Sequence, residues 1–190
     1  MRTMVLLAIS AVFLALTFAS PTRADDEAVW AALKSGGHVA LIRHALAPGF
    51  GDPENFSLDD PKTQRNLSAE GRAQAKRIGA AFTKHTILKA QVYSSQWRRC
   101  MDTADLLDLG PVTAEPILNS FFQNRGDRDG QTAALKTWLQ SANLRRPVVL
   151  VTHQVNISAF AGVYPASGEM TVMRREDDGA FTFAGRILIN

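Results

Sequence analysis

Two short apolar runs, at residues 38–42 and 148–151, place the tightest limit on what this chain can fold into. Neither run shows the polar alternation of a strand with one wet face. Runs of this kind are typical of strands that are buried on both faces of a parallel sheet. Gly36 and Gly37 lead into the first run and Pro147 into the second, so each run has a defined start.

Helical and extended patterns alternate along the rest of the chain. The patterns predict helices over residues 68–84, 97–107, 132–143 and 156–162, the first with Ser68 as its N-cap. They predict further strands at residues 91–93, 112–114, 171–174 and 181–189. This alternation indicates an α/β fold, a three-layer α/β/α sandwich with a mainly parallel central sheet.

The start of the chain has the pattern of a signal peptide. Arg2 is followed by an uncharged apolar run at residues 5–18, and residues 22–24 read Thr-Arg-Ala, a small–x–small cleavage pattern. An uncleaved anchor is the alternative, but a spanning helix needs roughly 20 apolar residues. We therefore expect cleavage after Ala24, a single catalytic domain over residues 25–190, no stable membrane insertion, and a periplasmic or secreted location.

The charge of the chain argues against a nucleic-acid partner. Lys and Arg number 21, Asp and Glu 18, and the formal net charge is +3. Loss of Arg2 and Arg23 with the signal leaves 19 basic and 18 acidic residues, and no Lys/Arg run forms a basic patch. The one cysteine, Cys100, is expected to be a small buried residue.

Histidines follow both apolar runs directly. Arg43 and His44 come after the first run, and His153 comes after the second. Ligands of open α/β sheets bind at the carboxyl ends of the strands, so these side chains are expected to meet. Arg99 begins a helix after a third strand, where free N–H groups and a guanidinium favour an anion. Two histidines and two arginines predict a pocket for a tetrahedral dianion.

Four motifs, in order, make the sequence similar to the histidine phosphatase superfamily, which has the phosphoglycerate mutase-like fold. Residues 43–45 read Arg-His-Ala where the family has Arg-His-Gly. Residues 67–75 resemble Leu-Thr-x-x-Gly-x-x-Gln-Ala, and residues 94–104 match Ser-Ser-x-x-x-Arg-x-x-x-Thr-Ala. His153 resembles the second family histidine, which comes after a Val-rich strand. With its export signal, the chain resembles an exported bacterial member.

The resemblance implies a role for each of these side chains. His44 would attack phosphorus as a neutral imidazole and become phosphohistidine, which water then hydrolyses. Arg43, Arg99 and His153 would bind the phosphoryl oxygens and stabilise the transition state. Gln154 is expected to reach the substrate from the pocket rim. The chemistry requires no metal and no cofactor.

The sequence lacks both proton donors that are usual in the family. Gln154 stands where one branch has an aspartate, and Ser120 stands where the other branch has a glutamate. A well-placed acid is worth roughly 100- to 10,000-fold in rate. Glu169, after a Gly turn and near the His153 segment, is the first candidate for a replacement. The other candidates are Asp52, Asp60, Asp127 and Asp129.

These residues predict a phosphatase that hydrolyses phosphate monoesters of small cell-envelope or periplasmic substrates, such as a phosphosugar. Two alternatives remain, a phosphohistidine protein phosphatase and a phosphate-binding module without turnover. A mutase is less favoured, because mutases of this fold act on cytoplasmic phosphoglycerates. Substrate specificity is expected to come from residues 45–63 and 117–130.

Overall fold

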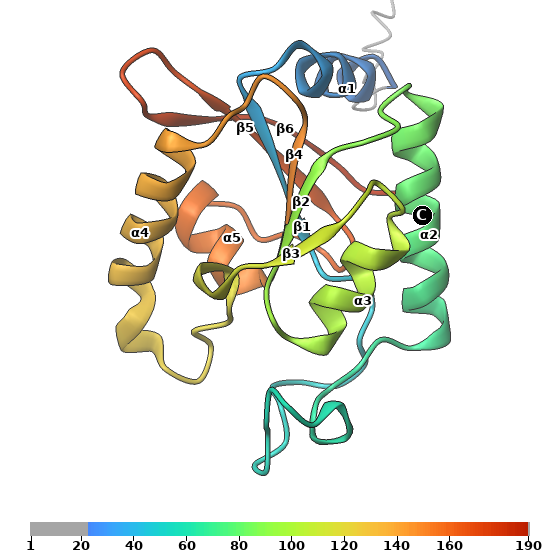
Figure 1. Ribbon diagram of the computed structural model, residues 1–190, viewed down its shortest axis with the longest axis vertical. Helices are drawn as coiled ribbons and strands as arrows, with labels where there is room; N and C mark the ends of the chain where they lie inside the picture. The colour runs from blue at the N-terminus through green and yellow to red at the C-terminus, as the bar shows by residue number, and fades with distance from the viewer. Residues whose placement is uncertain (1–22, 190) are drawn as a thin grey trace, which may run out of the picture.

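A six-stranded sheet forms the centre of the molecule in the computed structural model, which describes residues 23–189 (Figure 1). The strands are β1 (His38–Arg43), β2 (Gln91–Ser94), β3 (Val112–Ala114), β4 (Val148–Thr152), β5 (Met170–Arg175) and β6 (Phe181–Ile187). Their order is β3-β2-β4-β1-β5-β6. Strands β3, β2, β4 and β1 are parallel, whereas β5 and β6 are antiparallel additions at one edge. The predicted mainly parallel sheet is therefore confirmed as a mixed sheet with a parallel centre.

Helices cover both faces of the sheet, as predicted for three layers. The helices α1 (Arg23–Ser35), α2 (Ala69–Lys84) and α3 (Arg98–Leu106) lie on one face. The helices α4 (Arg128–Ser141) and α5 (Gln154–Ala161) lie on the other. Short 3₁₀ turns occur at Pro61–Thr63 (η1), Pro116–Leu118 (η2) and Arg125–Asp127 (η3).

The apolar runs at residues 38–42 and 148–151 form the two central strands of the sheet. Every residue of β4 is buried, and all but the last residue of β1 are buried. Ala40 and Ile42 join the core under α1, α2 and α3, whereas Val39 and Leu41 join the core under α4 and α5. Alternate side chains of a strand point to opposite faces, so a strand covered on both sides has no polar position.

The structure extends the predicted elements in three places. The helix α1 was not predicted, although Val29, Trp30 and Leu33 are buried against the sheet at helical spacing. The helices α4 and α5 begin at Arg128 and Gln154, earlier than predicted. Because α5 starts directly after His153, that histidine is the N-cap residue of the helix.

Most of the predicted signal peptide lies outside the described residues, and its cleavage after Ala24 stays a prediction. Within residues 23–189, no helix combines the length and the apolar character that a membrane crossing requires.

Packing explains why glycine stands at position 71 of the motif. A Cβ atom on Gly71 would lie 2.0 Å from the Leu46 carbonyl oxygen, so only glycine lets α2 approach this backbone. The Ser68 N–H donates to the same Leu46 carbonyl, and the Ser68 hydroxyl accepts from the Gly71 N–H as the predicted N-cap. This contact fixes the segment that comes after His44.

Candidate active site

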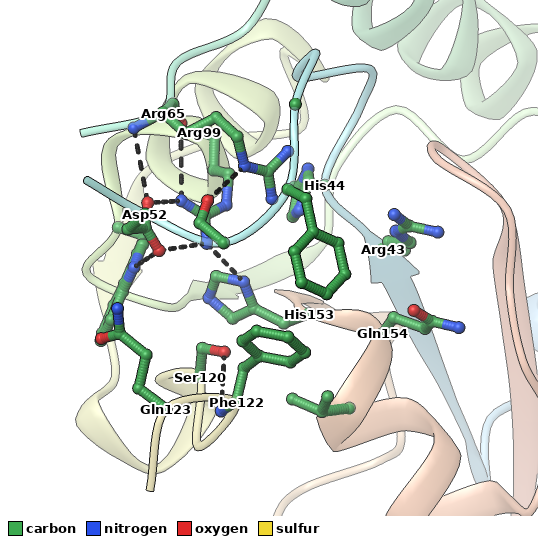
Figure 2. A pocket seen from close by; sticks show the side chains of 15 residues that line it. Arg43, His44, Asp52, Arg65, Arg99, Ser120, Phe122, Gln123, His153 and Gln154 are labelled. Carbon is green, nitrogen blue, oxygen red and sulfur yellow. Dashed lines mark hydrogen bonds and ion pairs between the residues drawn. The ribbon is translucent and has the colours of Figure 1, made fainter. Parts of the chain in front are cut away.

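A pocket opens at the carboxyl end of the parallel strands, where the sequence predicted it (Figure 2). It contains five of the six predicted site residues, namely Arg43, His44, Arg99, His153 and Gln154. The two segments expected to set specificity also reach it, through residues 49–52 of the first and Ser120, Phe122 and Gln123 of the second. Arg65, Trp97 and Val155 complete the lining.

His44 is a buried imidazole with one ring nitrogen fixed. Its Nδ1 lies 2.8 Å from the carbonyl oxygen of Ala45. A carbonyl oxygen only accepts, so Nδ1 carries the proton and Nε2 keeps its lone pair. The partner that orients this ring is thus a backbone group of the next residue, which the motif letters do not reveal.

The surroundings of His44 keep it uncharged. Burial, followed by the positive charge of Arg99, lowers the pKa of His44 from 6.5 to about 3, and Arg65 and Arg43 contribute in the same direction. Desolvation and nearby like charge both disfavour the imidazolium. At neutral pH, His44 is therefore a neutral imidazole with a free lone pair at Nε2.

His153 uses both of its ring nitrogens. Its Nε2 lies 2.8 Å from the Ser95 hydroxyl, and the Arg99 guanidinium donates to Nδ1 at 3.4 Å. Because Nδ1 accepts from Arg99, Nε2 carries the proton that Ser95 receives. Burial and the charge of Arg99 hold the pKa of His153 well below its ordinary value. The rings of His44 and His153 meet edge to face with centroids 5.6 Å apart.

Three arginines surround the two histidines. Arg99 is buried in the pocket, whereas Arg98 turns away and binds Asp102 at 2.6 Å. Arg43 donates to the Pro165 carbonyl at 3.0 Å. Burial and the charge of Arg99 lower the pKa of both Arg43 and Arg65, as expected where positive charges are concentrated.

Arg65 is the pocket residue that sequence reasoning missed. It precedes the Leu67–Ser68 motif by two positions, and its guanidinium donates to the carbonyls of Gly51 (2.7 Å) and Ala47. Arg65 therefore braces the 45–63 loop and adds a positive charge beside His44. Its place next to a family motif was the signal that could have found it.

Asn119 supports His153 from behind and was also missed. Its side-chain oxygen accepts from the Ser95 hydroxyl at 3.2 Å and from the Gln96 N–H at 2.9 Å. Ser95 is thereby held between Asn119 and His153. Cys100 is buried beside the same ring, and burial raises the pKa of its thiol to about 12, in keeping with the predicted structural role.

The structure does not bring Glu169 into the pocket. Its carboxylate accepts from the Ala166 N–H at 2.7 Å and lies 3.5 Å from Arg186, so it closes the turn before β5. The first-choice proton donor thus finds no support in this geometry, because the Gly turn that suggested it directs the carboxylate back to its own backbone. Of the other candidate acids, Asp52 lines the pocket. Ser120 lines it too, at the position where a glutamate is usual.

Asp52 makes the shortest ion pair of the pocket. Its two oxygens lie 2.6 and 3.0 Å from the two terminal nitrogens of Arg99, and the Trp97 indole donates to it at 3.0 Å. Burial raises the pKa of Asp52, but the hydrogen bonds and charge of Arg99 outweigh it and leave that pKa below its ordinary value. Asp52 is therefore an ionised carboxylate, and it is bound to Arg99, one of the residues predicted to bind phosphate.

The described residues contain no group of three or more His, Cys, Asp or Glu side chains placed to hold a metal ion. The pocket instead offers nitrogen donors, three guanidinium groups and two imidazoles, which bind oxyanions.

The comparison with protein families finds a match over part of the chain. Residues 39–123 match the profile described as histidine phosphatase superfamily (branch 1). The chain is thus similar to the histidine phosphatase superfamily over this segment. The matched segment carries Arg43, His44 and Arg99, while His153 lies beyond it and reaches the same pocket. A search of curated proteins found no significant match to the sequence.

Solved structures of this fold are similar over most of their length. The protein histidine phosphatase SixA, complexed with tungstate, aligns with a TM-score of 0.59 at 15% identity and covers 79% of this chain and 96% of its own. A mycobacterial glucosyl-3-phosphoglycerate phosphatase complexed with VO₃ gives 0.57 at 17% identity, covering 80% and 98%. A phosphoserine phosphatase from Entamoeba histolytica gives 0.58 at 14% identity, covering 78% and 95%. At these identities, the similarity confirms the α/β fold.

Proposed function

We propose that this protein hydrolyses phosphate monoesters through a phosphohistidine on His44. The observation that carries the proposal is the state of His44: its Nδ1 proton is bound to the Ala45 carbonyl, which leaves Nε2 as a neutral nucleophile inside a ring of arginines. A buried imidazole without surrounding donors would serve no phosphoryl chemistry. Here the donors and the lone pair share one pocket.

The reaction proceeds with these groups in two steps. Nε2 of His44 attacks phosphorus as the ester P–O bond breaks, and the leaving oxygen keeps the electron pair of that bond and takes a proton from water. Water then attacks the phosphohistidine, the P–N bond breaks, and inorganic phosphate leaves with His44 neutral again. Arg43, Arg65 and Arg99 stabilise the negative charge that spreads over the phosphoryl oxygens.

The leaving group sets the need for an acid. Among the described residues that line the pocket, Asp52 is the one carboxylate, and it is ion-paired with Arg99. We therefore propose substrates whose leaving group departs with little protonation, such as an aryl phosphate, an acyl phosphate or a sugar 1-phosphate. Phe50 and Phe122, whose rings meet 5.0 Å apart at the pocket wall, provide an apolar surface beside the phosphate.

The proposed setting is the periplasm or the cell exterior, with a phosphorylated small molecule of the envelope as substrate. The signal-peptide pattern supports the location. The oxyanions tungstate and VO₃, which are bound in structures of similar phosphatases, support a phosphorylated substrate. The similarity to SixA favours a second candidate, a phosphohistidine protein phosphatase. That reaction also has a good leaving group and needs no acid, but its phosphorelay substrates are cytoplasmic.

Hydrolysis of p-nitrophenyl phosphate by the mature chain, with a chelator present, tests the proposal. We expect turnover that resists the chelator and disappears in His44→Ala. Faster release of phosphate from a phosphohistidine protein than from small phosphate esters would favour the second candidate. Tight tungstate binding with no turnover of any phosphate would contradict the proposal and indicate a phosphate-binding module.

A further inference from the structure

The Asp52 carboxylate fills the guanidinium fork that the proposed reaction needs. Its Oδ1 accepts from Nη1 of Arg99 and its Oδ2 from Nη2, in a bidentate pair between two side chains that are both buried. This is the geometry with which arginine binds carboxylates and phosphates alike. Figure 2 shows Asp52 lying against Arg99, with His153 on the same guanidinium.

Few donors of Arg99 are left for an incoming phosphoryl group. Nη1 also donates to the Arg65 carbonyl at 3.4 Å, and Nη2 also donates to Nδ1 of His153. All four N–H groups of the terminal nitrogens thus have acceptors. The Arg99 Nε is buried without a hydrogen-bond partner among the described residues, as is the Nε of Arg43. A phosphoryl group that is to bind the fork must therefore replace an acceptor already there.

The Asp52 site is itself an oxyanion cradle. Besides Arg99, the Trp97 indole N–H donates to Oδ2 at 3.0 Å, and the Arg65 backbone N–H donates to Oδ1 at 3.4 Å. These groups converge on one carboxylate from two segments of the chain, the start of α3 and the end of the loop before α2. The donor set of two guanidinium N–H groups, an indole and a backbone amide would equally suit phosphoryl oxygens.

The segment that carries Asp52 differs from the helix that carries Arg99. It lies in the 45–63 loop, outside regular secondary structure and close to exposed residues. Gly49 and Gly51 take positive φ angles of 95° and 66°, and an added Cβ on Gly51 would meet nothing within 4 Å. Near Asp52 in the pocket, Phe50 is 86% exposed. Arg99, by contrast, is fixed in α3.

We propose that Asp52 is an internal anion of the phosphate pocket, which binds Arg99 when no phosphoryl group is present and leaves it when a phosphoryl group binds. The proposal rests on the proposed function, since it assumes that the pocket takes a phosphoryl group. Asp52 is a positioning residue that acts through Arg99. Without an occupant, three arginines would repel one another across a buried space, so Asp52 stabilises the empty pocket at the cost of substrate affinity.

The direct test follows the indole N–H of Trp97, which is bonded to Asp52 in the empty enzyme. We would record ¹H–¹⁵N spectra of the full-length mature chain during titration with tungstate, with Trp97→Phe to assign the peak among the three tryptophans. Exchange predicts that tungstate shifts the wild-type Trp97 indole resonance, because this proton loses the Asp52 carboxylate as its acceptor. A wild-type peak that stays put while tungstate binds would overturn the proposal.

Binding affinity gives the second readout, with a matched control. Asp59→Asn makes the same change of charge in the same loop, on an exposed side chain outside the pocket. We expect Asp52→Asn to bind tungstate at least about tenfold more tightly than both the wild type and Asp59→Asn. Weaker binding in Asp52→Asn would overturn the exchange and make Asp52 a fixed support of Arg99. If no variant binds tungstate, the phosphate pocket itself, and with it the proposed function, is contradicted.

Discussion

The ends of β1 and β4 look alike in sequence and differ in how they hold their histidines. Both strands are buried, both lead into a histidine, and both histidines are buried. His44 commits one nitrogen to its own backbone neighbour and leaves Nε2 open. His153 commits both nitrogens, one to Ser95 and one to Arg99. This difference supports our proposal that His44 is the nucleophile and that His153 is a supporting group.

The difference has a cause in local structure. His153 is the N-cap of α5, so the chain turns into a helix directly after it and the side chain lies against Ser95 and α3. His44 leads into a segment without regular secondary structure, which places the Ala45 carbonyl within reach of the His44 ring. Two equivalent positions at one sheet edge thus acquire different chemistry, because a helix succeeds one strand and a loop succeeds the other.

Removal of His44 should have the largest effect. The substitution His44→Ala deletes the nucleophile, and we expect turnover of p-nitrophenyl phosphate to fall by at least about 1,000-fold. The three arginines remain, so tungstate should still protect the variant against thermal unfolding. Residual turnover within tenfold of the wild type would show that another group attacks phosphorus.

Removal of His153 should have a smaller effect of a different kind. To donate to a phosphoryl oxygen, His153 must gain a proton at Nδ1, which the dianion favours and the empty pocket does not. Loss of such a preorganised donor costs about 100- to 1,000-fold in kcat, so His153→Ala should be slow but able to form phosphohistidine. If His153→Ala proved as inactive as His44→Ala and formed no phosphohistidine, the two histidines would not differ in role.

Removal of the Ser95 hydroxyl, which accepts from His153, should lower kcat less than removal of His153 itself. In Ser95→Ala the Nε2 proton of His153 loses its acceptor, and loss of about one hydrogen bond corresponds to roughly a tenfold decrease in kcat. Ser141→Ala, which removes an exposed hydroxyl on α4, is the control and should leave kcat unchanged. Ser95→Ala activity equal to that of the control would mean that Ser95 does not position His153 for the reaction.

The pH dependence of stability tests the charge state of His44 without any turnover. The folded pKa of His44 is about 3 against 6.5 for an ordinary histidine, so below pH 6.5 the unfolded chain binds the extra proton. The stabilisation by neutral His44 is complete above pH 6.5 and decreases towards pH 3, by up to about 1.4 kcal/mol per pH unit. When the free energy of unfolding is measured with denaturant between pH 7.5 and 5, it should change less with pH in His44→Ala than in the wild type. An equal change with pH in both proteins would mean that the pKa of His44 is the same in the folded and unfolded chains.

The sequence predicted the sheet and the pocket because both depend on local patterns. The apolar runs of β1 and β4 are buried on both faces, and residues directly after parallel strands meet at one edge. The resemblance of residues 94–104 to the family motif added Arg99 to the predicted pocket. The helix α1 was within reach as well, since Val29, Trp30 and Leu33 are spaced for one helical face.

The parts that were missed depend on pairings between distant segments. Asp52 and Arg99 are 47 positions apart and meet only because the 45–63 loop folds over α3. Asn119 reaches Ser95 across 24 positions. Glu169 was favoured by its closeness in sequence to His153, yet hydrogen bonding to the Ala166 N–H turns its carboxylate away. Spacing along the chain carries no information about such contacts.

The central claim is that Nε2 of His44 attacks phosphorus, and trapping the intermediate tests it most directly. Rapid acid-free quenching of the mature chain during p-nitrophenyl phosphate turnover, followed by mass spectrometry of peptides, locates the phosphoryl group. The account predicts a phosphate on His44, sensitive to acid, stable to alkali and absent from His44→Ala. Turnover without phosphate on His44, or with phosphate on His153 instead, would contradict it.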